Sequence, residues 1–471
     1  METPNPIKNI SASSHPIKDI LDSHNTFVIF VKILFLIAMA SIGVFSIYSA
    51  TKSLVIPYVY EKDFMQDYLL AQALLHGFDP YLPISQLAQQ FIGELPNNVL
   101  PHPSPHPPPV AVLCLPFCIF NYEHAAVAWF LFEIICIFFA TYLILCKLHN
   151  KSDLKLTIFI FLLLMAWPPL FLELVFGQLM TLLLLLLVCA WLSLGSGKNI
   201  TGGIFIGLLI AIKLMAWPFI IFFAVRKNWS AVIAAGITVI TSNVIAGLIM
   251  GFDKIVYYYF KVSAIVSPLY RAYEFNFSMW TIGWRLFDGT GSPILKGLEA
   301  PPIVAAPFLA LFLSFAMPIL LLAVGLKLAL RTRSFDTSFG ILVCVSTLVN
   351  PVAWTHYLIL ILIPIVIVGR DLLIHDMPKT ETWYFLLLCA SLLITNLEIR
   401  LFILKLTGLE MTTGRVQVPF VATLLTLIPA VSVILLLWLV SHMDHFYKED
   451  TNIDDDHKKT KKLITSSKAH G

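Results

Sequence analysis

Apolar runs recur along almost the whole sequence, and shorter polar stretches separate them. A run of about 20 apolar residues crosses a hydrocarbon core of about 30 Å as a helix, and backbone polar groups in lipid must be paired within the segment. The pattern predicts an all-α polytopic membrane protein with about twelve spans. The predicted spans are 27–49, 108–120, 123–146, 158–172, 177–194, 200–224, 229–250, 303–328, 338–352, 355–370, 382–402 and 417–440.

Two amphipathic stretches interrupt the polar region that follows the first span. Between Asp63 and Gly77, the residues Phe64, Tyr68, Ala71 and Leu75 recur at helical spacing. Between Ile84 and Ile92, apolar and glutamine-rich faces alternate in the same way. We expect both stretches to form helices that lie in the membrane interface with their apolar sides down.

The distribution of basic residues predicts the topology. Lys8, Lys18 and Lys32 place the N-terminus inside by the positive-inside rule. The predicted organisation is a disordered cytoplasmic tail (1–26), a transmembrane domain (27–440) and a charged cytoplasmic tail (441–471). Two long loops, 51–107 and 251–302, and a turn near 350–355 then fall together outside. Four residues violate the rule in this arrangement: Lys147, Lys151, Lys155 and Lys198.

Composition agrees with the membrane assignment and excludes other classes. Hydrophobic residues make up 58% of the chain and charged residues 13%, whereas a soluble protein has about 25% charged residues. The net charge of +3 gives no reason to expect nucleic acid as a partner. The seven cysteines lie in apolar segments without metal-ligand spacing. His102 and His106 flank prolines and make a poor metal site, so we expect no metal and no cofactor.

Two carboxylates in the first loop are candidate functional groups. Asp63 and Asp67 are four residues apart, which places both on one face of a helix. One of them could act as a general base that takes a proton from a sugar hydroxyl. Both could instead be ordinary carboxylates that favour the positive end of the helix dipole.

Several cationic and polar residues are further candidates. Lys213 lies inside a predicted span, where a charge costs about 2.5–3.5 kcal/mol, so it either binds a lipid phosphate or pairs with Glu133 or Glu173. Arg285 lies near Asn276 in the second loop and could hold a phosphate or anchor the loop at the interface. His356 stands at the outer end of a span, where an ordinary interfacial histidine is the alternative to a site residue.

Six short motifs occur in order along the chain. They are Asp63-Phe64 with Tyr68, Ala71 and Gly77 through Tyr81; His106 through Pro109; Phe176-Gly-Gln178; Gly207 through Lys213; Asn276-Phe-Ser278 with Arg285; and Asn350-Pro351 through Tyr357. Together they resemble glycosyltransferase family 87, the polyprenyl-phosphate-mannose-dependent membrane glycosyltransferases. His106 stands where that family commonly has Tyr, and Tyr357 stands where a second His often occurs.

The resemblance implies a GT-C fold in the cell (inner) membrane, with the active site on the extracytoplasmic face. It implies an inverting transfer of a hexose, often mannose, from a polyprenyl-phosphate donor to a glycolipid or glycan acceptor. Asp63 would be the base, and Arg285, His356 and Lys213 would stabilise the departing phosphate. Asn276, Asp67 and Tyr68 would contact substrate. The rival interpretation is a transporter or flippase for a lipid or polar solute; the oligomeric state and the exact sugar stay open.

Overall fold

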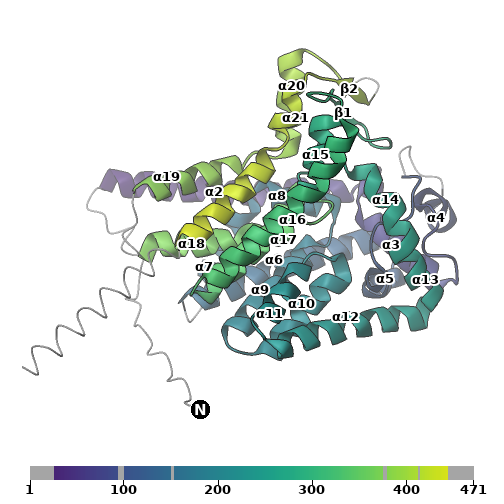
Figure 1. The fold of residues 1–471 in the computed structure, drawn as a ribbon, viewed down its shortest axis with the longest axis horizontal. Helices are drawn as coiled ribbons and strands as arrows, with labels where there is room; N and C mark the ends of the chain where they lie inside the picture. The colour runs from purple at the N-terminus through teal and green to yellow at the C-terminus, as the bar shows by residue number, and fades with distance from the viewer. Residues whose placement is uncertain (1–25, 94–99, 150–152, 375–378, 412–413, 444–471) are drawn as a thin grey trace, which may run out of the picture.

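The computed structural model describes residues 26–93, 100–149, 153–374, 379–411 and 414–443. The predicted tails, 1–26 and 441–471, therefore lie outside the described residues except at their inner edges. Almost all described secondary structure is helical, as predicted (Figure 1). The exception is a short parallel pair, β1 (Gly297–Glu299) and β2 (Arg415–Gln417).

Among the described residues, six helices are long and apolar enough to cross a membrane, or eight if two bent pairs each count as one span. The six are α2 (Thr26–Thr51), α6 (Tyr122–His149), α12 (Trp229–Met250), α16 (Pro307–Arg331), Thr355–Ile374, which comprises η5 (Thr355–Ile361) and α18 (Leu362–Ile374), and Val421–Met443, which begins with α21 (Val421–Leu425). The prediction of about twelve spans is therefore not confirmed.

The bent pairs replace two predicted straight spans. In the first, α7 (Leu154–Met165) and α8 (Pro168–Phe176) meet at 82°. Pro168 and Pro169 occupy the first turn of α8, where proline's missing N–H is tolerated, but neither could continue α7. In the second, α19 (Lys379–Ser391) and α20 (Asn396–Thr407) meet at 74°, and a capping box at Thr395 starts α20.

Shorter helices fill the space between the long ones and the loops. They are α3 (Phe64–Leu75), α4 (Ile84–Phe91), α5 (Pro108–Cys114), η3 (Leu115–Ile119), α9 (Met180–Gly195), α10 (Asn199–Lys213), α11 (Trp217–Val225), α13 (Phe252–Tyr257), η4 (Tyr258–Val262), α14 (Ser263–Tyr270), α15 (Met279–Phe287) and α17 (Phe335–Leu348), with the single turns η1 (Lys52–Leu54) and η2 (Tyr58–Glu61). Figure 1 shows α3, α4, α5, α13 and α14 gathered on one side of the helical body.

The predicted span 200–224 is wrong, because the chain doubles back inside it. Helix α10 ends at Lys213, and Leu214 takes a left-handed conformation (φ 50°) before α11 begins. At the far ends of the two helices, the Asn228 side chain donates a hydrogen bond to the Asn199 side chain (3.0 Å). Since those ends touch, α10 and α11 form a hairpin whose tip carries Lys213. Gly207 lets α10 pack tightly on α12, since a Cβ there would lie 2.6 Å from the Ala235 carbonyl oxygen.

The predicted span 108–120 also fails to cross. Before it, His106 contacts Asp67 of α3, and after it, the Tyr68 hydroxyl of α3 donates to the Phe120 carbonyl (2.9 Å). Both ends of this segment therefore meet the same helix. Consequently α6 begins at the end of the molecule where the first loop lies, as the hydrogen bond from the Tyr122 hydroxyl to the Val59 carbonyl (2.8 Å) shows.

These two corrections reverse the direction of α6 and remove the predicted charge violations at Lys147 and Lys198. We call the end that holds 52–93, 100–107, 251–306 and 349–354 the loop end. At the opposite end, Lys147 lies over the Trp191 ring, Trp191 donates to Asp336, and Asp336 pairs with Arg370 (2.6 Å). Arg226 there donates to the carbonyls of Leu330 and Thr332. The violating Lys147 and Lys198 thus lie with the other basic residues.

The first-loop helices form as predicted but not in the predicted place. Ten of the twelve residues of α3, from Phe64 to Ala73, are buried. Phe64 stacks on Trp129 of α6 (4.8 Å between ring centroids). Helix α4 keeps its glutamines exposed, while Ile84, Leu87 and Ala88 are buried in the protein core. The interfacial placement of α3 is therefore wrong: neighbouring helices cover it on all sides.

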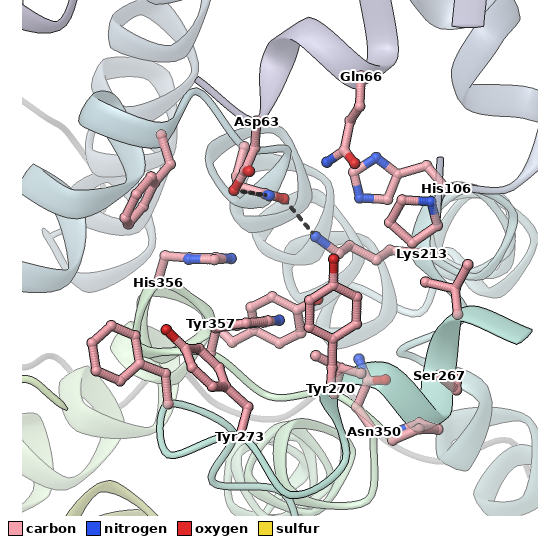
Figure 2. Close-up of a pocket in the computed structure, with 18 of the residues that line it drawn as sticks. Asp63, Gln66, His106, Lys213, Ser267, Tyr270, Tyr273, Asn350, His356 and Tyr357 are labelled. Carbon is pink, nitrogen blue, oxygen red and sulfur yellow. Dashed lines mark hydrogen bonds between the residues drawn. The ribbon is translucent and has the colours of Figure 1, made fainter. Parts of the chain in front are cut away.

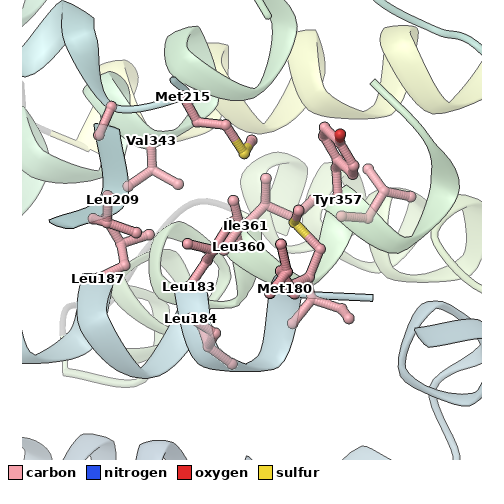
Figure 3. Close-up of a cluster of buried hydrophobic side chains, with 14 of the residues drawn as sticks. Met180, Leu183, Leu184, Leu187, Leu209, Met215, Val343, Tyr357, Leu360 and Ile361 are labelled. Atoms are coloured by element: carbon pink, nitrogen blue, oxygen red, sulfur yellow. The ribbon is translucent and has the colours of Figure 1, made fainter. Parts of the chain in front are cut away.

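The central core surrounds η5, the turn that carries the predicted His356. Figure 3 shows Leu183, Leu187 and Met180 of α9, Leu209 of α10 and Val343 of α17 packed around Tyr357, Leu360 and Ile361. All of these side chains are buried. The packing holds the start of η5 rigidly between three helices.

The hairpin and the reversed α6 predict an accessibility pattern. Cysteines at the exposed positions Ser196 and Ser230 should react with an impermeant thiol reagent from one side of the membrane, and a cysteine at Asp288 from the other. Reactivity of intact and permeabilised cells, compared with the unsubstituted protein, gives the measurement. If 200–224 crossed straight, Ser196→Cys and Ser230→Cys would react from opposite sides.

Candidate functional site

A cavity of about 730 Å³ lies at the loop end, within the range typical of ligand sites, about 300–1,000 Å³. Its wall comes from segments far apart in the sequence: the N-terminus of α3, the proline-rich stretch before α5, the α8–α9 turn, the tip of the α10–α11 hairpin, η4 and α14, the start of η5, and α20. Asp63, Lys213 and His356, all predicted site residues, line it.

Gln178 joins Asp63 to Lys213 by two hydrogen bonds, which are the dashed lines between the labelled Asp63 and Lys213 in Figure 2. The Gln178 amide nitrogen donates to Asp63 Oδ2 (2.7 Å), and Lys213 Nζ donates to the Gln178 amide oxygen (2.9 Å). Gln178 is the last residue of the predicted Phe-Gly-Gln motif. The motif's glycine, Gly177, takes φ +66° at the end of α8, and a Cβ there would lie 3.0 Å from Lys62 and 3.2 Å from Phe64. Gly177 thus allows the α8–α9 turn to approach α3 closely.

The backbone fixes the same contact. The Asp63 N–H donates to the Phe176 carbonyl (2.8 Å), and Lys62 Nζ donates to the carbonyls of Leu174 and Val175 (both 2.7 Å). Two of the last carbonyls of α8 therefore receive a cation, which favours that helix terminus. The Asp63 side chain is held at the cavity wall by this double attachment.

The surroundings of Asp63 suit a base. Burial raises the pKa of Asp63 above its ordinary value, while the Gln178 hydrogen bond and the nearby His106 and Lys213 partly oppose that rise. A carboxylate with a raised pKa is a stronger proton acceptor than an ordinary aspartate.

Lys213 does not make the predicted pair with a glutamate. Glu173 Oε1 instead accepts the Met180 and Thr181 N–H groups (2.5 and 3.2 Å) and so caps the start of α9. Glu133 is buried on α6, and its carboxylate makes no hydrogen bond to any described residue. The Lys213 ammonium instead lies 4.7 Å from the centre of the Tyr357 ring and borders the cavity. Lys213 therefore faces the cavity without a direct ion pair to either glutamate.

Asp67 stands one turn behind Asp63 and contacts the cavity through a histidine. His106 Nδ1 lies 2.5 Å from Asp67 Oδ1, both side chains are buried, and His106 lines the cavity. The sequence predicted His106 as part of a family motif and as a poor metal ligand, but it did not predict this pair. The separation of 39 residues between the two gave no local signal.

His356 reaches the cavity because a clamp of polar residues shapes the turn before it. Asn276 Oδ1 accepts the N–H groups of Ser278 and Ala353 (3.1 and 3.0 Å), and its amide donates to the carbonyls of Tyr270 and Pro351. The Ser278 hydroxyl donates to the carbonyls of Leu348 and Asn350. Asn276 is fully buried and does not line the cavity, so its role is to position the 350–355 turn.

Arg285 and Tyr68 do not reach the cavity. Arg285 is fully buried and donates to the carbonyls of Asn276 (3.0 Å) and Thr423 (3.2 Å) and to the Thr426 hydroxyl. Burial lowers the pKa of Arg285 to about 10, so it stays charged at neutral pH. The Tyr68 hydroxyl donates a hydrogen bond to the Phe120 carbonyl and accepts one from the Gln72 side-chain amide. The structure thus gives both residues supporting positions.

Arg400 is a cavity residue that sequence reasoning missed. It lies on α20 and lines the cavity, where it pairs with the buried Glu274 and donates to the Tyr273 hydroxyl (2.9 Å). Its guanidinium also lies 4.2 Å from the Phe275 ring centre. The predicted single span 382–402 gives no reason to place Arg400 at a site. The Thr395–Glu398 capping box is the local sign that a new helix begins there.

The fold is that of a multi-pass helical membrane protein with a polar cavity set among its helices. The sequence model of glycosyltransferase family 87 matches residues 105–351, slightly more than half of the chain. The chain belongs to glycosyltransferase family 87 and is therefore a membrane glycosyltransferase. The match includes Gln178 and Lys213, while Asp63, Asp67, Tyr68 and His356 lie outside it. No curated protein and no solved structure shows a significant match.

The described residues contain no group of three or more His, Cys, Asp or Glu side chains placed to hold a metal ion. Besides neutral amides and hydroxyls, the cavity is bordered by one carboxylate, Asp63, by the cations Lys213 and Arg400, and by the imidazoles of His106 and His356. This set can accept a proton at one point and surround an anion at others.

The two loop arginines should differ sharply in their effect on stability. Arg285→Met removes the hydrogen bonds that the buried guanidinium donates to two carbonyls and two hydroxyls, so we expect a loss of about 3 kcal/mol in the free energy of unfolding. Arg271 is exposed and lies over the Trp284 ring (3.7 Å), so Arg271→Met should cost only about 0.5–1 kcal/mol. Thermal unfolding midpoints in detergent compare the two; equal midpoints would contradict a supporting role for Arg285.

Proposed function

We propose that the chain transfers a hexose, mannose by the family resemblance, from a polyprenyl-phosphate sugar to an extracytoplasmic glycolipid or glycan acceptor, with inversion. The observation that carries the proposal is the chain Asp63–Gln178–Lys213 on a cavity large enough for a sugar phosphate. It sets a proton acceptor and a cation on one wall, joined by one amide.

Asp63 acts as the general base. Its carboxylate takes the proton of the acceptor hydroxyl while that oxygen attacks the anomeric carbon, and the bond to the phosphate oxygen breaks on the opposite face of the sugar. General base catalysis by a positioned carboxylate contributes about 10²–10⁴-fold. Gln178 keeps one Asp63 oxygen engaged, which orients the other toward the cavity.

Lys213 and Arg400 hold the phosphate, with His356 beside them. Both cations line the cavity, and their charge favours the negative charge that the phosphate gains as the bond breaks. His356 Nε2 is buried and has no hydrogen-bond partner among the described residues. A phosphate oxygen would satisfy it. Arg285, expected from the sequence to bind phosphate, supports the cavity wall through the Asn276 carbonyl instead.

The proposed orientation puts the cavity on the extracytoplasmic side, in a GT-C arrangement. The basic residues Lys147, Lys198, Arg226, Arg331 and Arg370 belong to the opposite end, which the positive-inside rule makes cytoplasmic. A lipid-borne donor needs no cytosolic nucleotide, which suits such a site. The apolar residues around the cavity, among them Leu214 and Val266, suit a prenyl chain.

Replacement of the base tests the proposal. Purified protein should transfer radiolabelled mannose from a polyprenyl-phosphate donor to a membrane lipid extract, and Asp63→Asn should lower turnover by about 10² or more while donor binding is kept. Asp79→Asn is the matched control, since Asp79 lies in the same loop but pairs with Lys254 outside the cavity. Full activity of Asp63→Asn would remove Asp63 from the mechanism.

The pH dependence of turnover should report the same carboxylate. Because burial raises the pKa of Asp63, activity should fall with decreasing pH above the range of an ordinary aspartate, as the base becomes protonated. Gln178→Leu removes a hydrogen bond that lowers this pKa, so the acidic decline should move to higher pH. An acidic decline that stays in place in Gln178→Leu would contradict the assignment of that decline to Asp63.

A further inference from the structure

The Asp67–His106 pair is the strongest feature of the cavity that the proposed function leaves unused. Asp67 is 1% exposed, and its Oδ2 has no hydrogen-bond partner among the described residues. A buried carboxylate of this kind requires a compensating positive charge close by. His106 Nδ1, at 2.5 Å from Oδ1, is the group in direct contact with it.

The contact fixes the orientation of the imidazole. Nδ1–H donates a hydrogen bond to Asp67. The other ring nitrogen, Nε2, makes no hydrogen bond to any described residue, and His106 lines the cavity. Nε2 is therefore free to contact a bound ligand. Backbone contacts hold the segment: the Tyr81 hydroxyl donates to the His106 carbonyl (3.2 Å) and the Tyr258 hydroxyl to the Pro105 carbonyl (2.7 Å). A carboxylate behind one ring nitrogen fixes the tautomer and stabilises the imidazolium form.

The neighbours of His106 decide what its free nitrogen can meet. Figure 2 shows His106 on the same wall as Asp63, Gln66 and Lys213. Asp63 already accepts a hydrogen bond from Gln178 and is assigned the proton of the acceptor, so His106 serves a different atom. The charged and titratable groups near it include Asp63 and Asp67 on α3, Cys114 on α5, Lys213 on α10, Tyr81, Tyr258 on η4, Tyr270 on α14, and His356 and Tyr357 on η5.

We propose that His106, positioned by Asp67, is a second acid–base residue that donates its Nε2 proton to the departing phosphate oxygen. The inference rests on the proposed function. The acceptor proton passes to Asp63, the new bond forms at the anomeric carbon, and the electron pair of the broken bond stays on the phosphate oxygen, which takes the His106 proton. The lipid phosphate leaves as its monoanion. Transfer of the Asp63 proton back to His106, through water in the cavity, restores both groups with no net proton change.

The two carboxylates of α3 thereby take different roles although they lie on one helical face. Asp63 meets the acceptor directly, while Asp67 acts through the histidine and is a positioning residue. The division follows from burial: Asp63 lines the cavity, whereas Asp67 lies behind the imidazole.

The test compares His106→Gln with His102→Gln in the full-length protein, with polyprenyl-phosphate mannose as the donor. His102 is the matched control because it is a buried histidine in the same proline-rich segment but does not line the cavity. We expect His106→Gln to lower kcat by about 10² with little change in KM, and His102→Gln to stay within about threefold.

Asp67→Asn keeps the test decisive if His106→Gln does not fold. The variant leaves an acceptor for Nδ1–H but removes the negative charge, so kcat should fall while KM changes little. A kcat near that of the wild type in His106→Gln or in Asp67→Asn, or an equal loss in His102→Gln, would overturn the inference. Absence of any transfer by the wild-type protein would instead overturn the proposed function itself.

Discussion

Lys213 carries an ammonium group to the tip of a hairpin inside an apolar protein, and a charge at such a position must find polar partners within reach. Gln178 provides the first partner and passes the connection on to Asp63. The hydrogen-bonded chain therefore joins three segments that are up to 150 residues apart. Three further contacts hold the end of α8 against Asp63. They are the tight turn at Gly177, the hydrogen bond from the Asp63 N–H to the Phe176 carbonyl, and the hydrogen bonds from Lys62 to two carbonyls of α8.

The same constraint explains why several helices break. A straight helix from 199 to 225 would carry Lys213 through the apolar layer without a partner, whereas the hairpin ends α10 at the cavity. The bend between α7 and α8 likewise brings the end of α8 to Asp63, and the bend between α19 and α20 brings Arg400 to Glu274. Irregular backbone inside a membrane protein is tolerated where it lines a cavity and its polar groups are satisfied there. Each break thus allows a following or preceding helix to carry a polar residue to the loop end.

Polar residues at the loop end divide into those that build the wall and those that face the cavity. The side chains of Asn276, Ser278 and Arg285 form hydrogen bonds with backbone groups and hold the 350–355 turn in place. Asp63, Lys213, His106, His356 and Arg400 keep polar atoms at the cavity. A single motif can contain both kinds, as in Asn276-Phe-Ser278 with Arg285, where every polar side chain proves structural. Residue type alone does not separate these roles, because a buried guanidinium can serve carbonyls as well as phosphates.

The sequence by itself determined the class of the protein: apolar runs, low charge and six motifs in order predicted a helical membrane protein of the glycosyltransferase family, and helix starts at Asp63 and Ile84 followed from local spacing. These properties depend on neighbouring residues along the chain. The tertiary structure alone decided which segments cross, which double back, and which polar groups meet. Hydropathy cannot show whether residues 200–224 form one straight span or a hairpin of two short helices, because the same apolar residues are present in either arrangement. Likewise the Asp67–His106 and Glu274–Arg400 pairs join residues 39 and 126 positions apart, and only the packing of α3, α5, α14 and α20 brings them together.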